Sequence, residues 1–138
     1  MIEVVSHKAS VEKATEKAMK RAARMIGGTV AGHAVDLCPV DTGLLRNSIT
    51  YAIGGEAPEK RVYYDDNNEQ TGEYDGEAER DEDHEITVYI GTNVQYAPYQ
   101  ELGAPNIHLN ANPFLRPAME NYKREIEQII QKELGSLR

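Results

Sequence analysis

The sequence has little cysteine and no long apolar run. Cys38 is the single cysteine among 138 residues, so the chain cannot form an internal disulfide and is not a disulfide-stabilised scaffold. No apolar run reaches the ~20 residues that a bilayer-spanning helix needs. Residues 1–5 lack the basic start and apolar stretch of a signal peptide. We therefore expect a protein that is made in the cytosol and leaves it only as part of an assembly. We expect no membrane partner.

Signatures of catalysis and metal binding are also missing. The sequence holds no Gly-x-Ser-x-Gly elbow, Walker loop or dinucleotide fingerprint. His33, Asp36 and Cys38 lie close together, but a zinc site needs three or four ligands with paired spacings. A calcium loop counted from Asp65 needs glycine where Gln70 stands. We expect no enzyme activity, catalytic residue, metal site or cofactor, with calcium in the acidic segment as an open alternative.

The negative charge is concentrated in one segment. The chain carries 15 Lys and Arg against 23 Asp and Glu, a net charge of −8, which argues against a simple binder of phosphate backbones. Residues 55–85, called the insert below, hold thirteen acidic and three basic residues, so the rest of the chain is nearly neutral. The acidic residues that we expect to face a channel or a partner are Asp65, Asp66, Glu69, Glu73, Asp75, Asp81, Glu82 and Asp83.

Hydrophobic periodicity predicts a long first helix. Over residues 10–38 apolar residues recur three or four apart, and basic residues occupy mostly the opposite face. Gly27, Gly28 and Gly32 weaken its middle, which marks a bend or the close approach of another backbone.

Strands and a second helix follow. Alternating apolar residues predict strands over 49–53 and 86–90 and a weaker one over 61–64. The last helix is expected over residues 112–134, with Asn112 as its cap.

These elements predict an α+β fold in a single domain, residues 1–138. The core is expected over residues 10–54 and 86–134, where the N-terminal and C-terminal helices pack on a small antiparallel sheet. The insert is expected to form an acidic loop or hairpin.

Three compact motifs lie between these elements: a first block at residues 39–49, a second at 96–103 and a third at 113–118. Their aromatic residues suit protein contacts better than exposure to solvent. The candidates for a subunit interface or a fold corner are Pro39, Asp41, Thr42, Gly43, Leu45, Arg46, Tyr96, Tyr99, Glu101, Gly103, Pro113 and Phe114.

Simple chemistry suggests a role for several of these residues. Asp41 or Thr42 is expected to cap the short helical turn after them, and Gly43 to adopt a conformation that is costly for other residues. Arg46 and Glu101 are expected to pair, within one subunit or between two.

The three blocks, in this order, resemble those of a family of tail-component or neck proteins of long-tailed bacteriophages and prophages. The first block reads Pro-Val-Asp-Thr-Gly-Leu-Leu-Arg-Asn-Ser-Ile, the second Tyr-Ala-Pro-Tyr-Gln-Glu-Leu-Gly, and the third Pro-Phe-Leu-Arg-Pro-Ala. A Gly-Thr pair at residues 91–92 precedes the second block. The resemblance spans residues 10–134 and omits the insert.

The resemblance implies a structural protein of the virion, located at the head–tail junction. Its partners would be copies of itself in a ring (a hexamer for a tail terminator), other neck proteins and the tail tube protein. DNA would pass through the channel without sequence-specific binding. Tail terminator or tail completion is the preferred role, and another neck or minor capsid component is the alternative.

Two questions stay open at this stage. The insert could face the channel and repel DNA, dock on a basic neighbour, or extend into solvent. A rival function of another class is an acidic DNA mimic that inhibits a basic host protein.

Overall fold

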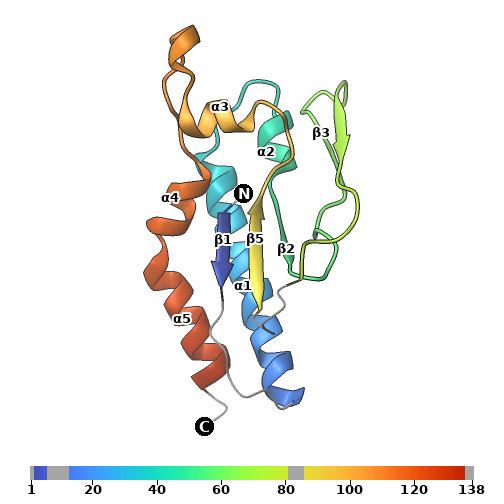
Figure 1. Ribbon diagram of the computed structural model, residues 1–138, viewed down its shortest axis with the longest axis vertical. Coiled ribbons are helices and arrows are strands. Elements are labelled where there is room, and N and C mark those ends of the chain that lie inside the picture. Colours follow the sequence, from blue (N-terminus) through green and yellow to red (C-terminus); the bar gives the residue numbers. More distant parts are fainter. Residues whose placement is uncertain (1, 6–12, 81–85, 136–138) are drawn as a thin grey trace.

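The computed structural model describes residues 2–5, 13–80 and 86–135, and it has the expected α+β architecture (Figure 1). The strands are β1 (Ile2–Val5), β2 (Thr50–Ile53), β3 (Val62–Tyr64), β4 (Thr71–Glu73) and β5 (Thr87–Gly91). The helices are α1 (Lys13–Leu37), α2 (Leu44–Ser48), α3 (Ala97–Leu102), the 3-10 helix η1 (Pro105–Ile107), α4 (Leu115–Glu120) and α5 (Lys123–Leu134).

β5 is the centre of a three-stranded antiparallel sheet. β1 pairs with one side of β5 and β2 with the other. Tyr51 lies opposite Ile90 and Ile53 opposite Val88, so these side chains share one face of the sheet. α1 packs across this face and passes behind the sheet in Figure 1.

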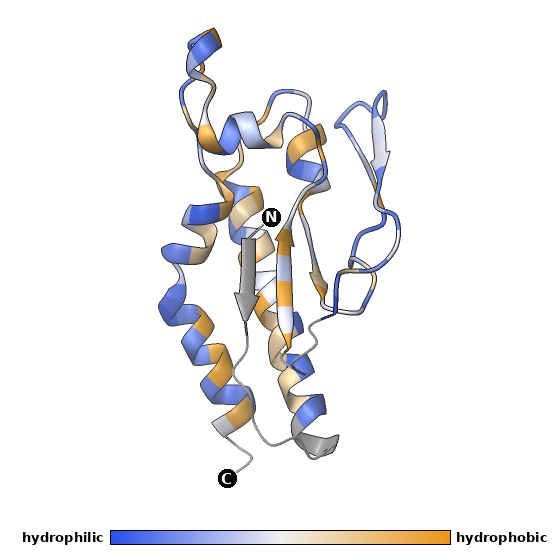
Figure 2. Cartoon of the chain, in the orientation of Figure 1, coloured by the Kyte–Doolittle hydropathy of each residue, from blue (hydrophilic) through white to orange (hydrophobic). Residues whose placement is uncertain are grey.

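Small side chains form much of the buried face of α1. Ala18, Ala22, Val30 and Ala34 are almost completely buried, which lets the sheet on one side and α4 and α5 on the other approach closely. Figure 2 shows the hydrophobic residues of α5 mostly on the side that faces α1. Among the described residues, no helix has both the length and the apolar character needed to cross a membrane.

α1 is unbroken across its glycines. Gly27 is buried under the ring of Tyr51, and a Cβ atom at this position would overlap the ring. Glycine is needed at position 27 because an aromatic ring packs there. The expected bend of the helix, or close approach of another backbone, is not the reason. At Gly32, by contrast, a Cβ would meet no atom of the described residues outside α1 within 4 Å.

The C-terminal segment forms two helices, although its periodicity predicts a single one. Tyr122 leaves helical geometry, with φ −119° and ψ 24°, between α4 and α5. Its ring stacks on His33 of α1, with the ring centroids 3.5 Å apart and the planes 2° from parallel. His33 Nε2 also lies 2.9 Å from a carboxylate oxygen of Glu125. The break thus allows a specific contact with α1.

The described part of the insert contains a two-stranded hairpin. β3 pairs with β4 antiparallel, with Tyr63 opposite Gly72. The sequence pattern predicts β3 but misses β4 and β1. β4 contains no apolar side chain, and β1 ends in two adjacent valines, so neither gives a clear alternation.

Gly27→Ala tests the packing of α1 on Tyr51. The added Cβ overlaps the ring, so we expect the free energy of unfolding to fall by about 1 kcal/mol or more relative to the matched Gly32→Ala variant. Gly32→Ala should itself gain ~0.5–1 kcal/mol, since alanine favours the helix and meets no neighbour. Urea unfolding curves measure both. Equal effects of the two substitutions would contradict the contact.

Candidate functional site

The three blocks lie at one end of the molecule. The first block forms the turn before α2, α2 itself and the residue before β2, the second contains α3, and the third contains the start of α4. In Figure 1, α2 and α3 lie together at the end opposite the C-terminus, and α4 starts beside them.

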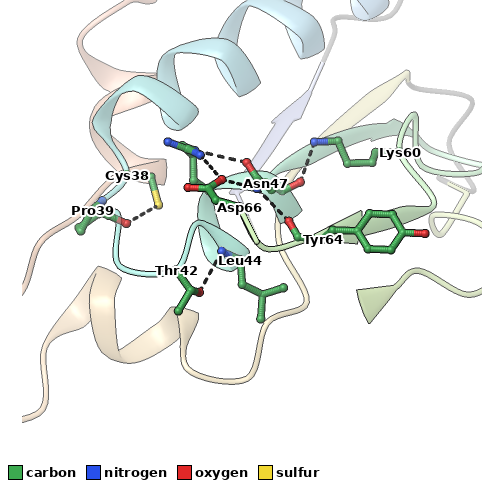
Figure 3. A network of polar contacts seen from close by, with 9 residues as sticks. Cys38, Pro39, Thr42, Leu44, Asn47, Lys60, Tyr64 and Asp66 are labelled. Atoms are coloured by element: carbon green, nitrogen blue, oxygen red, sulfur yellow. Dashed lines mark hydrogen bonds and ion pairs between the residues drawn. The ribbon is translucent and has the colours of Figure 1, made fainter. Parts of the chain in front are cut away.

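The turn of the first block depends on Gly43. This residue has φ +86°, and a Cβ atom here would overlap the carboxylate of Asp66 in the insert. The backbone N–H of Asp66 donates to the carbonyl of Thr42 at 2.8 Å. Gly43 occupies the cap position of α2, and of the two residues expected to cap it, Thr42 bonds to the start of the helix: its Oγ1 accepts from the N–H of Leu44 at 3.3 Å (Figure 3). Glycine provides both the backbone conformation and the space for the insert.

Arg46 joins the first block to the insert. Its Nη2 atom lies 2.5 Å from Asp66 Oδ1. Asn47 Nδ2 donates to the same oxygen at 3.0 Å and to the carbonyl of Tyr64 at 2.8 Å (Figure 3). Within the described chain, Arg46 therefore pairs with Asp66, and the expected pairing with Glu101 is not formed.

Two tyrosines of the insert are buried beside the first block. The rings of Tyr63 and Tyr74 have centroids 5.5 Å apart, and burial raises the pKa of Tyr74. The Tyr74 hydroxyl donates to the carbonyl of Ser48 at 2.6 Å, and the Ser48 hydroxyl bonds to that of Thr92 at 2.5 Å. The Tyr63 hydroxyl donates to the side-chain oxygen of Asn93. The insert is thus attached both to the first block and to the segment after β5.

Glu101 caps α4 from a distant position in the sequence. Its Oε2 atom accepts from the N–H groups of Phe114 at 2.7 Å and Leu115 at 3.2 Å, and Oε1 accepts from that of Arg116 at 2.8 Å. The start of a helix has unpaired N–H groups and partial positive charge, so a carboxylate is favourable there. The cap expected from Asn112 is supplied by Glu101 instead. The second block therefore holds the third in place, with Phe114 fully buried.

The chain between α3 and α4 forms a projecting segment, residues 104–111, which we call the arm (Figure 1). Gly103 precedes it with φ +78°, and a Cβ atom here would lie 2.9 Å from the backbone nitrogen of Ala111. Ala104 and Leu109 form a β-bridge, with hydrogen bonds of 2.9 and 3.0 Å between their backbones. Glycine thus allows the two ends of the arm to meet.

Two clefts flank α3. The turn-side cleft, about 420 Å³, lies between the first block, α3 and the arm; it is lined by Pro39, Val40, Asp41, Thr42, Gly43, Leu45, Tyr96, Tyr99, Gln100, Ile107 and Leu109. The strand-side cleft, about 370 Å³, lies between the segment after β5, α3 and the start of α4; it is lined by Thr92, Asn93, Val94, Gln95, Ala97, Pro98, Glu101, Leu102 and Leu115. The first cleft brings together seven of the residues that the sequence singles out.

The surface around these clefts is apolar and poor in charge. Leu102 is 74% exposed, Ile107 66% and Tyr99 55%. Residues 91–115 contain a single charged side chain, Glu101, whose carboxylate is occupied by α4. Leu102 belongs to the second block but is not among the candidate residues, and Ile107 lies outside all three blocks. The sequence feature that points to both residues is the scarcity of charge over residues 91–115.

The acidic residues of the insert have different surroundings. Asp65 is buried, and its carboxylate accepts from the backbone N–H of Glu69 at 2.7 Å, which closes the hairpin turn. Asp66 pairs with the first block as described above. Glu69, Glu73 and Asp75 are exposed. The remaining candidates, Asp81, Glu82 and Asp83, lie outside the described residues.

Cys38 lies at the base of the first block. Its Sγ atom donates to the carbonyl of Pro39 at 3.4 Å, and burial raises the pKa of the thiol to about 11. Because the thiolate is the nucleophilic form, little of this cysteine is reactive near neutral pH. Within the described residues, no three His, Cys, Asp or Glu side chains are grouped so that they could hold a metal ion.

A family model matches most of the chain. Residues 5–103 match the HK97-gp10-like family, described as "Bacteriophage HK97-gp10, putative tail-component". The matched range includes the first and second blocks and the insert, while the third block lies beyond it. The chain therefore belongs to this family of bacteriophage tail components, which confirms the resemblance seen in the sequence. No curated protein and no solved structure matches the chain.

Removing the Glu101 carboxylate tests the cap of α4. Glu101→Ala leaves three N–H groups without their charged acceptor, so we expect the free energy of unfolding to fall by about 1–3 kcal/mol. Glu127→Ala, at an exposed position of α5, is the control and should change it by less than ~0.5 kcal/mol. Thermal and urea unfolding measure the difference. A loss no larger than that of the control contradicts the cap.

Gly43→Ala tests the attachment of the insert. Gly76 also has positive φ, at +74°, but no atom of the described residues lies within 4 Å of a Cβ built there. Both alanine substitutions carry a backbone cost of ~1 kcal/mol, and only Gly43→Ala also displaces Asp66. We expect faster proteolysis within residues 55–80 for Gly43→Ala than for Gly76→Ala. Equal cleavage rates would show that Gly43 does not position the insert.

Proposed function

We propose that this chain is a non-enzymatic structural protein of the phage neck, a ring subunit at the head–tail junction that acts as the tail terminator. The observation that carries the proposal is the partly apolar surface around α3, which is poor in charge, in a member of a tail-component family. The cores of subunit contacts are poor in charged residues and enriched in aromatic ones. Exposed Tyr96 and Tyr99 beside the turn-side cleft have this character.

In this role, copies of the chain form a closed ring, a hexamer in the terminator, through which DNA passes without sequence-specific contacts. The tail tube protein and other neck proteins are its further partners. The exposed carboxylates of Glu69, Glu73 and Asp75 suit a channel wall, where negative charge repels the DNA backbone and keeps it moving.

Electron microscopy of phage particles made without this protein tests the terminator role. Because a terminator stops growth of the tail tube, its loss should give tails of irregular and excessive length next to filled, tailless heads. Supplying the wild-type chain from a plasmid should restore tails of uniform length. Tails of normal length that fail to join heads would assign the chain to another layer of the neck, and defective heads would assign it to the capsid.

A further inference from the structure

We propose that the surfaces on the two sides of α3 are the two halves of one head-to-tail contact, in which the arm that borders the turn-side cleft of one copy inserts into the strand-side cleft of the next copy. The occupant of the strand-side cleft is thus a second copy of this chain. The inference rests on the proposed ring, and it adds the two surfaces that meet.

Charge favours a second copy as the occupant. Most of the negative charge of each copy lies on its insert, where Glu69, Glu73 and Asp75 are exposed, so two copies repel each other when their inserts approach. Residues 91–115 differ, because their single carboxylate already binds the start of α4. The arm contains no Asp or Glu, so it enters the strand-side cleft of another copy without placing a second carboxylate there.

The two clefts are different surfaces, as a ring requires. No residue lines both of them: Tyr99 and Gln100 of α3 face the turn-side cleft, whereas Pro98 and Leu102 face the strand-side cleft. A cyclic ring larger than a dimer is built from heterologous contacts, in which one patch meets another patch. α3 separates two such patches within one copy.

The arm has the exposure and the order that insertion into a neighbour requires. Ile107 near its tip is 66% exposed, while the backbone bonds between Ala104 and Leu109 keep its shape. The backbone N–H of Asn112 also donates to the carbonyl of Gln100 at 2.7 Å. An arm that is already ordered loses little conformational entropy on binding. The strand-side cleft offers it Val94, Pro98 and Leu115 as apolar partners.

Cross-linking of assembled phage particles tests the contact. One variant carries Ile107→Cys on the arm and Gln95→Cys in the strand-side cleft, and it is treated with a short bismaleimide. Cys38 stays in place because it is buried and little of its thiol is ionised near neutral pH. We expect a ladder of chain multiples in the double variant and no multimers in either single variant.

Every alternative result contradicts the proposed contact, and each points to a different arrangement. If amine cross-linking gives a ladder and the double variant does not, the ring stands and the contact lies elsewhere. If neither treatment gives a ladder, the ring itself is wrong. Dimers in the Ile107→Cys single variant would indicate a symmetric contact. A link from position 107 to another phage protein would assign the arm to that protein.

A charge placed on the arm gives a second readout. Ile107→Asp buries a carboxylate in the proposed contact, so the infectious titre should fall by about tenfold or more. Val62→Asp is the matched control, because Val62 is exposed on the hairpin and lines neither cleft. Circular dichroism of both purified variants checks that they fold. An equal titre for the two folded variants would argue against the contact.

Discussion

The carboxylate of Glu101 fixes the end of the molecule that carries the three blocks. By accepting three backbone N–H groups at the start of α4, it holds α3 beside α4 and sets the base of the arm. The same bonds occupy the single charged side chain of residues 91–115. The hydrogen bonds of Glu101 therefore order this surface and also leave it without an unpaired carboxylate.

A second set of bonds attaches the insert to the same end. The insert is strongly acidic, yet one of its carboxylates pairs with Arg46 and two of its tyrosines reach the interior. Gly43 leaves the space that this docking needs. The first block thus serves as the base for the hairpin as well as the wall of a cleft, so one sequence motif meets two structural demands.

Elements that bury one face could be predicted, because burial of one face requires apolar residues at regular spacing in the sequence. This holds for α1, β2, β3 and β5, whereas α2 was expected from the turn that precedes it. The roles of Thr42 and Gly43 followed from local turn chemistry, since the interacting groups are neighbours in the chain. The partners of Arg46 and Glu101 did not follow, because a charged side chain does not specify which distant group it meets. The break at Tyr122 was hidden because the apolar spacing continues across it.

The position of β5 has a consequence for how the chain folds. This strand is the centre of the sheet, yet it is synthesised after both of its neighbours, β1 and β2. At roughly 5–20 residues per second, the ribosome needs several seconds to pass from β1 to β5. Until then neither neighbour has its partner, and α1 has no complete sheet to cover. Formation of the sheet is therefore a late, long-range step, of the kind that slows folding.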